Sequence, residues 1–588
     1  MAVTIFAAMF FRNQNLRDLK RAIRSTRHKI HLLGYGKFIL KSFEVILITI
    51  LSMITFKLRK SGCRLQAEFI DSIKIANLQS TEEKKKAEKI FEGIVNYNYQ
   101  IFNYQLNFRS VNHLEFMLDH LAHLMDECEY TELKHNFSSS YAHCWNVDPL
   151  HGFKFDTLSI PYNKAEIKIP WELGRFNFYP QLAIYIEDVD KLAFIFSRDI
   201  ISFFSCNSST DNSVQWANAM EAGIRIFNIL KTYSILKNRN ATFLLGVERI
   251  LSSGINLHFK YITCNNEFSF IQTSNHFAAN ILGLAAINYQ YKSRFLSFIL
   301  PRLLVKEVFR NTDSGLLNEG STAYHRFTSE IYLSAYSLLR NSGMKKNQEL
   351  ECVFCKMANI VSSIENPLGL HTQFGDSDGG HLNWIAIPFS KKLNAFTPYD
   401  VANYEKFISV CFGMLNIELP TLSKDNVIEV ANAQLYVVKK DGIYLAINNI
   451  RPSDKIYNKT HFHDDHGFVE FFDCGKPVLI DPGTYCYTSN LDLRRRFQSS
   501  EVHFNNNKFQ QIDNPFADFF RPLNEVLVEM SNDSFKCTVF DNSHKTELVA
   551  VSVDFRKNSV EFKIHDGVSS GGTEVFLNYL SEPYCVEN

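Results

Sequence analysis

The spacing of apolar residues changes once along the chain, and this change constrains the fold more than any other feature. From about residue 85 to 415, apolar residues recur at the 3.6-residue spacing of amphipathic helices, as in SEIYLSAYSLLRNSG (329–343), for which Gly343 is the expected C-cap. After about residue 425 the apolar runs are short, rich in β-branched and aromatic residues, and bounded by turn residues, as in GIYLAINNI (442–450). Helices followed by strands predict an α+β multidomain chain and not an alternating α/β sheet.

The length of 588 residues also favours at least two domains, because a single hydrophobic core seldom organises so long a chain. We expect an N-terminal helical extension (1–84), a helical domain (85–415) and a β domain (425–588). The extension contains the apolar run VILITILSMITF (45–56), whose 12 residues are too few to cross a hydrocarbon layer of roughly 30 Å. A buried or interfacial helix is therefore favoured over an anchor, and no membrane span is expected.

Charge and cysteine usage narrow the function classes. Lysine plus arginine and aspartate plus glutamate number 62 each, so the net charge gives no argument for a nucleic-acid partner. The twelve cysteines are scattered without the spacing of a disulfide framework, which favours free thiols and a reducing compartment. The apolar start MAVTIFAAMFF lacks the preceding basic residue of a signal peptide.

One short stretch, KTHFHDDHGFVEFF (459–472), concentrates imidazole and carboxylate groups directly before an apolar run. If the stretch is a strand, His461 and His463 lie on the same face, because side chains alternate between the two faces of a sheet. Two imidazoles on one face predict a metal site or a proton-transfer site, and ordinary hydrogen-bonded histidines are the alternative.

Seven motifs are spread along the chain in a fixed order. They are IPWELGRF (169–176), WANAMEAGIRIFN (216–228), SNHFAANILGL (274–284), NEGSTAYHRFTSEIYL (318–333), FGDSDGG (374–380), HFHDDHGFVEFFDCGKPVLIDPGTYCYT (461–488) and RRRFQSSEVHFN (494–505). Taken in this order, they resemble the motifs of the heparinase II/III-like polysaccharide lyases. The resemblance implies an N-terminal (α/α) toroid of helical hairpins and a C-terminal antiparallel β-sandwich, with the active site between them.

The resemblance implies cleavage of an acidic polysaccharide by β-elimination, in which the C5 proton of a uronic acid is removed and the oxygen on C4 leaves. The neighbouring carboxylate makes that proton weakly acidic, so the site must neutralise the carboxylate and supply a base. By motif position, Asn275 would neutralise the carboxylate, Tyr324 would act as base, acid or both, and His461 would share the proton transfer. Because the unperturbed pKa of tyrosine is about 10, a positive charge such as Arg326 would have to lower it.

Four neighbours of these residues are candidates for substrate binding: His276, Glu319, His325 and Arg326. For the two histidines the alternative is a structural hydrogen bond, since adjacent residues on a helix point about 100° apart and one of each pair faces away. Glu319 either orients a catalytic group or simply lies near a helix start. Asp376 is expected to cap a turn and not to bind sugar.

The resemblance also implies a structural zinc ion, held by His463, Asp481 and His503. Two imidazole nitrogens and one carboxylate oxygen suit zinc and leave a fourth position for water. The alternative is that Asp481 only opens the turn DPG and that His503 is a surface residue.

Two function classes remain open at this point. The first is a lyase that acts on an acidic polysaccharide, such as a bacterial exopolysaccharide or surface polysaccharide. The second is a carbohydrate-binding or polysaccharide-assembly protein that keeps the fold without turnover. The resemblance implies a periplasmic or envelope location, whereas the missing signal peptide and the cysteines favour the cytoplasm.

Overall fold

The computed structural model describes residues 81–382 and 426–564, apart from short breaks and two longer ones at 452–460 and 498–524. The apolar run 45–56 and nearly all of the expected N-terminal extension lie outside the described residues. Among the helices that are described, none combines the length and the hydropathy needed to cross a bilayer.

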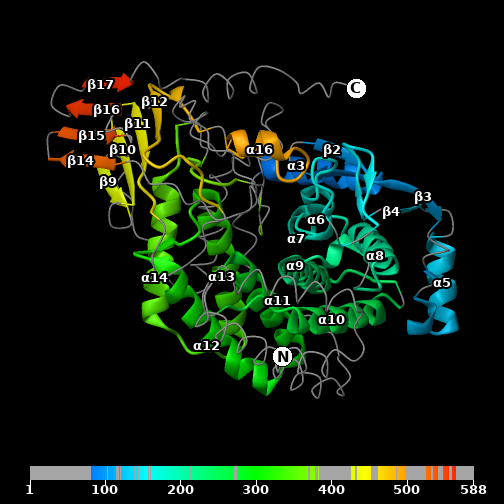
Figure 1. Ribbon diagram of the computed structural model, residues 1–588. Coiled ribbons are helices and arrows are strands. Elements are labelled where there is room, and N and C mark those ends of the chain that lie inside the picture. The colour runs from blue at the N-terminus through cyan, green and yellow to red at the C-terminus, as the bar shows by residue number, and fades with distance from the viewer. Residues whose placement is uncertain are drawn as a thin grey trace, which may run out of the picture.

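The helical region forms an arc in which successive helices alternate between an inner and an outer row (Figure 1). Helices α7, α9, α11 and α13 pack side by side along the inner row, and α8, α10, α12 and α14 lie on their outer side. This alternation follows from helical hairpins joined by short loops. The bounds are α6 (Lys168–Gly174), α7 (Tyr179–Tyr185), α8 (Val189–Cys206), α9 (Ala219–Asn238), α10 (Val247–Cys264), α11 (Asn275–Tyr291), α12 (Arg294–Asn311), α13 (Thr322–Asn341) and α14 (Gln348–Ser363).

Side-chain caps and a glycine set the ends of these helices. The Asn218 side chain accepts a hydrogen bond from the Glu221 amide at the start of α9, at 2.9 Å. The Ser321 hydroxyl accepts one from the Tyr324 amide at the start of α13, at 3.1 Å. Gly343 follows the end of α13 with a φ of 97°, so the expected C-cap is confirmed.

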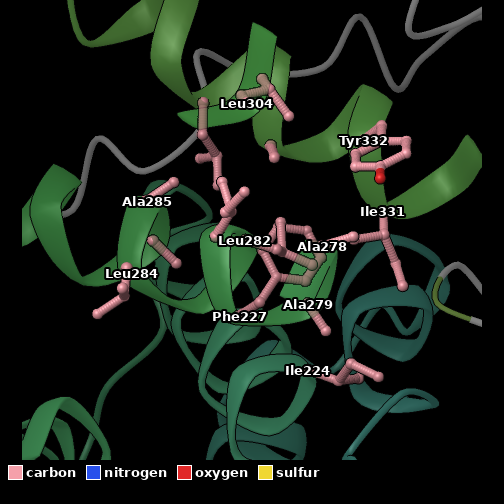
Figure 2. Close-up of a cluster of buried hydrophobic side chains, with 14 of the residues drawn as sticks. Ile224, Phe227, Ala278, Ala279, Leu282, Leu284, Ala285, Leu304, Ile331 and Tyr332 are labelled. Atoms are coloured by element: carbon pink, nitrogen blue, oxygen red, sulfur yellow. The ribbon is translucent and has the colours of Figure 1, made fainter. Parts of the chain in front are cut away.

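One of the apolar cores of the helical region lies where the inner row meets α12. Figure 2 shows Phe227 of α9, Leu282 of α11 and Ile331 of α13 converging in this core, with Leu304 of α12 beside them. All four side chains are buried, so this contact removes their apolar surface from water and fixes the helices that carry the site.

The helical region also contains short antiparallel strand pairs, which the helical prediction for 85–415 did not include. In the first pair Tyr99 and Ile101 are buried on one strand and Leu106 on the other, so the local apolar period is two and not 3.6. The pairs are β1 (Asn98–Ile101) with β2 (Tyr104–Asn107), β3 (Arg109–His113) with β4 (Tyr141–His143), β5 (Val147–Asp148) with β6 (Phe153–Lys154), and β7 (Thr312–Asp313) with β8 (Leu316–Leu317); helices α3 (Thr81–Val95) and α5 (Glu127–Phe137) lie among them.

Beyond residue 425 the chain forms two antiparallel sheets, as the short runs of β-branched and aromatic residues predict. Their strand orders are β13-β12-β11-β10-β9 and β14-β15-β16-β17, and both contribute to one apolar cluster in which Tyr436 and Phe535 lie 6.2 Å apart between ring centroids. The closed toroid and the sandwich stay predictions. The strands are β9 (Asn426–Val430), β10 (Leu435–Lys440), β11 (Ile443–Asn448), β12 (Val469–Asp473), β13 (Lys476–Leu479), β14 (Glu525–Met530), β15 (Ser534–Phe540), β16 (Glu547–Asp554) and β17 (Ser559–Ile564), and helix α16 (Leu491–Phe497) lies between the sheets in sequence.

The strand considered for the stretch 459–472 does not include its histidines. Residues 461–468 form turns and irregular backbone, with Gly467 at a φ of 85°, and β12 begins only at Val469. His461 and His463 nevertheless meet at one point, because packing against residues 374–377 replaces strand alternation. The Asp376 amide donates to the His461 carbonyl at 2.9 Å, and a Cβ on Gly375 would lie 2.6 Å from that same oxygen.

Candidate active site

Tyr324 and His461 stack face to face at the junction of the helical region and the loop before β12. Their ring centroids are 3.6 Å apart and their planes are inclined by 19°. Tyr324 lies in the first turn of α13 and is 5% exposed, while the His461 side chain keeps 14% of its surface exposed. Both are residues to which the family resemblance gives a role in proton transfer, and the fold brings them into direct contact.

The Asp376 carboxylate lies beneath this pair and joins four side chains. Its Oδ2 accepts from His461 Nδ1 at 3.2 Å and from Arg494 Nη2 at 2.7 Å. Its Oδ1 accepts from His463 Nε2 at 3.1 Å and from the Thr484 hydroxyl at 3.0 Å. Asp376 therefore has a larger role than the turn cap expected from its sequence, since it holds both histidines of the HxH motif.

The charge on Asp376 decides which ring nitrogens carry hydrogen. Burial alone would raise the pKa of Asp376, but the Arg494 guanidinium and the two imidazoles hold it well below its usual range. An ionised carboxylate only accepts hydrogen bonds, so we assign hydrogens to His461 Nδ1 and His463 Nε2. When the His461 imidazole is neutral, its Nε2 is then the basic nitrogen.

Glu319 lies on the other side of His461, with its carboxylate fully buried. Its Oε2 is 4.0 Å from His461 Nε2, and its Oε1 accepts from Asn311 Nδ2 at 3.3 Å. The backbone N–H of Asn275 also donates to this carboxylate. Burial raises the pKa of Glu319, opposed by His461 and by the hydrogen bonds from Asn311 and Asn275.

Asn275 begins α11 and is 1% exposed. Its side-chain oxygen accepts no hydrogen bond from the described residues. A buried side-chain oxygen that accepts no hydrogen bond is unusual, because most buried polar atoms have hydrogen-bond partners. The structure thus brings Asn275, Glu319, Tyr324 and His461 together with Asp376, and we call these five residues the central cluster.

His276 and His325 both make the hydrogen bonds that the structural alternative expects, and a substrate-binding role for them stays a prediction. His276 Nδ1 lies 2.7 Å from Glu267 Oε1, and although burial lowers the pKa of His276, the Glu267 carboxylate outweighs it and raises that pKa. His325 is fully buried, accepts from the Leu317 amide at 3.3 Å and has Nε2 3.4 Å from the Met357 carbonyl. Burial lowers the pKa of His325 to about 4, so this ring is neutral near pH 7.

Arg326 does not supply a separate positive charge to Tyr324. Its Nη1 pairs with Glu330 Oε1 at 2.8 Å, and both side chains are 3% exposed. Its Nη2 donates to the Gly380 carbonyl at 2.8 Å. The ion pair neutralises the charge that was expected to lower the pKa of Tyr324, so Arg326 connects α13 to the glycine-rich segment after it.

The motif IPWELGRF has a structural role, which its sequence did not reveal. Arg175 makes two hydrogen bonds of 2.8 Å to the Glu221 carboxylate of α9, and it also pairs with Glu172 of α6. Its guanidinium lies 5.7 Å from the ring centroid of Phe327 on α13. The motif therefore joins three helices around one buried arginine, including the helix that carries Tyr324.

A second set of contacts joins the helical region to residues 487–491. The fully buried Glu166 carboxylate accepts from the amides of Tyr487 and Thr488 at 2.9 and 3.1 Å. Lys168 Nζ lies 4.4 Å from the Tyr487 ring centroid, and Arg494 Cζ lies 4.7 Å from that same centroid. Sequence motifs did not single out Glu166 or Lys168, because their partners lie more than 300 residues away.

The predicted zinc ligands are only partly within the described residues. His503 lies outside them, and Asp481 Oδ1 accepts from the Gly483 amide at 2.8 Å, which is the turn contact of the alternative. Among the described residues, no group of three or more metal-ligating side chains could hold a metal ion. The geometry at His463 still fits a ligand, because Nε2–H donates to Asp376 and a metal-binding histidine commonly donates its other nitrogen to a carboxylate.

Comparison with known proteins finds similarity to this chain at the level of the fold. No family model and no curated protein sequence matches it. A crystal structure of heparinase III matches with a TM-score of 0.51 at 12% identity, over 92% of this chain and 75% of that one. Heparan sulfate lyase HepC from Pedobacter heparinus matches with a TM-score of 0.42 at 14% identity, over 91% of this chain and 75% of that one. The likeness to heparinase III shows that the chain has a heparinase-like fold.

Proposed function

We propose that the protein is a polysaccharide lyase that cleaves a uronic-acid-containing acidic polysaccharide by β-elimination. The observation that carries the proposal is the contact between Tyr324 and His461, whose imidazole is oriented by Asp376. The heparinase-like fold supports the proposal at the level of architecture only.

In this reaction Tyr324 and His461 would divide the proton transfers. The base removes the C5 proton, the electron pair forms the C4=C5 double bond, and the C4–O bond breaks with the proton delivered to the leaving oxygen. The Tyr324 hydroxyl is suited to take or return that proton, and the basic Nε2 of His461 would assist from the stacked ring. Because Nδ1–H is held by Asp376, the imidazole cannot turn its reactive nitrogen away without losing a charge-assisted hydrogen bond.

Asn275 would stabilise the charge that develops on the substrate carboxylate. The Asn275 side chain is buried at the start of α11, and its Nδ2 group is the one that can donate to a carboxylate, since the amide oxygen only accepts. An amide N–H directed at the carboxylate strengthens as negative charge grows toward the enolate-like intermediate.

We also propose that His463, Asp481 and His503 hold a structural zinc ion. Zinc bound there would stabilise the loop that carries His461, because the ion binds only the folded arrangement of its ligands. No step of the elimination requires it.

The function is tested by incubating the purified protein with a panel of acidic polysaccharides. Each cleavage should create an unsaturated uronide, seen as new ultraviolet absorbance of the C4=C5 bond conjugated to the carboxylate. Tyr324→Phe is the control for a contaminating lyase, because it removes only one hydroxyl. Binding of a glycan without new absorbance would contradict the lyase proposal and support a binding or assembly protein.

A further inference from the structure

The Glu319 carboxylate lies where three segments distant in sequence meet: the start of α13, the start of α11 and the loop that carries His461. It lies two residues before Ser321, the N-cap of α13, and so moves with the helix that carries Tyr324. It contacts the first residue of α11 and faces the loop that carries His461. The side chain is 0% exposed, although glutamate is almost never fully buried unless it is paired.

Toward α11, Glu319 satisfies a backbone group that the helix itself cannot satisfy. The first amides of a helix have no intrahelical acceptor, and a side chain at the N-cap usually supplies one. The N-cap of α11 is Ser274, whose side chain makes no capping hydrogen bond. The Glu319 carboxylate accepts the Asn275 N–H instead, and its negative charge also suits the positive end of the helix dipole.

Toward the reacting groups, Glu319 faces the basic nitrogen of His461 but does not bind it directly. The distance from Oε2 to His461 Nε2 is 4.0 Å, longer than a hydrogen bond. The other oxygen is held by Asn311, whose Nδ2 is also 3.2 Å from the Tyr332 hydroxyl. Asn311 thus anchors the carboxylate through Oε1, while Oε2 is the oxygen that faces His461.

We propose that Glu319 is a positioning residue that fixes Asn275 relative to Tyr324, with one carboxylate oxygen facing His461, and does not contact the substrate. The inference rests on the proposed lyase function for its kinetic consequences, but the anchoring of Asn275 can be measured without turnover. It differs from the substrate-binding role expected from the sequence, because a fully buried carboxylate anchored by two donors has little surface to offer a sugar.

The test compares Glu319→Ala with Glu319→Gln. Alanine removes every acceptor, so kcat should fall by about 100-fold, the scale of a misplacement of about 1 Å, while KM stays unchanged. Glutamine keeps an acceptor oxygen for the Asn275 amide and should restore most of kcat. A raised KM with normal kcat in either variant would overturn the proposal, since that is the signature of a lost substrate contact.

Glu307→Gln is the matched control. Glu307 is a second buried carboxyl, and it lies close enough to Glu319 that the Glu319 charge helps to raise the pKa of Glu307. None of the contacts described for the central cluster involves Glu307. Its replacement should leave kcat and KM unchanged. Equal kinetic losses in Glu307→Gln and Glu319→Ala would mean that any buried carboxyl nearby matters, and this would overturn the specific role of Glu319.

Hydrogen exchange separates this inference from the function itself. In Glu319→Ala, the Asn275 amide, followed in a peptide that begins several residues before it, should exchange at least about tenfold faster than in the wild type, because the Asn275 N–H loses its acceptor. Glu319→Gln should keep the slow exchange. Unchanged exchange in Glu319→Ala would overturn the inference whether or not the protein is a lyase. If the wild type cleaves no glycan but the exchange changes as expected, the positioning role stands and the lyase proposal fails.

Discussion

Arg494 and Asp376 form an ion pair that is almost completely removed from water, with 2.7 Å between Nη2 and Oδ2 and 1% exposure of each side chain. Arg494 lies on α16 of the C-terminal part, and Asp376 follows the last long helix of the helical region. The pair connects these two parts of the chain at the carboxylate that also bonds His461. Loss of either partner should therefore affect both stability and the orientation of His461.

Replacing Asp376 by Asn should destabilise the protein by about 3–5 kcal/mol, because it leaves Arg494 buried without a counter-charge. Urea denaturation measures this change in the free energy of unfolding. Asp492→Asn is the control, since Asp492 forms an exposed pair with Arg495 and should change stability by less than about 1 kcal/mol. Similar losses of stability in the two variants would contradict the claim that the buried Asp376–Arg494 pair stabilises the fold.

Tyr324→Phe should lower kcat by about 10²–10⁴-fold, the usual loss on removal of a general acid or base, with KM and the melting temperature nearly unchanged. Tyr336→Phe removes a hydroxyl from the same helix, where it bonds Glu351 at 2.8 Å, and should leave kcat unchanged. Full activity in Tyr324→Phe on a proven substrate would exclude this residue as the base.

Asn275→Ala should lower kcat on the order of 10²–10³-fold, as expected for loss of a donor to a developing oxyanion. Stability should change little, because the Asn275 side-chain oxygen accepts no hydrogen bond from the described residues. The kinetic loss is measured with saturating substrate and compared with that of Asn288→Ala. Asn288 lies on the same helix as Asn275, and its amide donates to Ser297 of α12 at 3.0 Å. A rise in KM alone would assign Asn275 to ground-state binding.

The zinc proposal predicts different behaviour for the two histidines of the HxH motif. His463→Ala should release the metal and lower the melting temperature, whereas His461→Ala should keep the metal and lose activity. Elemental analysis of protein purified without chelator, before and after each substitution, measures the metal content. Absence of bound metal from the wild type would remove the zinc proposal and leave the elimination mechanism intact.

Glu307 should make the stability of the protein fall as pH rises. Burial raises the pKa of Glu307 to about 7, so between its ordinary pKa of about 4.3 and 7 the folded state binds more protons than the unfolded state. Unfolding curves at about pH 5 and about pH 8 should show that Glu307→Gln escapes part of this loss, up to about 3 kcal/mol relative to the wild type. An identical pH dependence in both proteins would mean that the Glu307 carboxyl is not protonated in the fold.

The long helices and the sheet strands could be predicted from the sequence because local periodicity and capping determine them. SEIYLSAYSLLRNSG repeats its apolar face over several turns up to Gly343, and in the structure α13 ends at Asn341, two residues before that glycine. The pair β1 and β2 was missed, since strands of four residues carry too few alternations to stand out beside strong helical signals. His461 and His463 lie outside a strand because the turn at Gly467 separates them from β12.

The candidate site could be predicted only where a motif marked it. Asn275, Tyr324 and His461 were found by family resemblance, and the fold brings them together. Asp376 was taken for a turn residue because it lies between glycines in FGDSDGG, and its partner Arg494 is 118 residues away. Contacts of that range depend on how the two parts of the chain pack, which no local pattern encodes.

The contacts of the Glu166 carboxylate limit how this protein can be divided into fragments or combined into chimeras. It is buried in the helical region, yet donors to it come from the backbone of Tyr487 and Thr488. A fragment that stopped before these residues would leave the carboxylate without those donors, and burial already raises the pKa of Glu166. In a chimera, the helical part and the C-terminal part therefore cannot be exchanged independently. A C-terminal part taken from another protein must place two backbone amides where those of Tyr487 and Thr488 donate to Glu166.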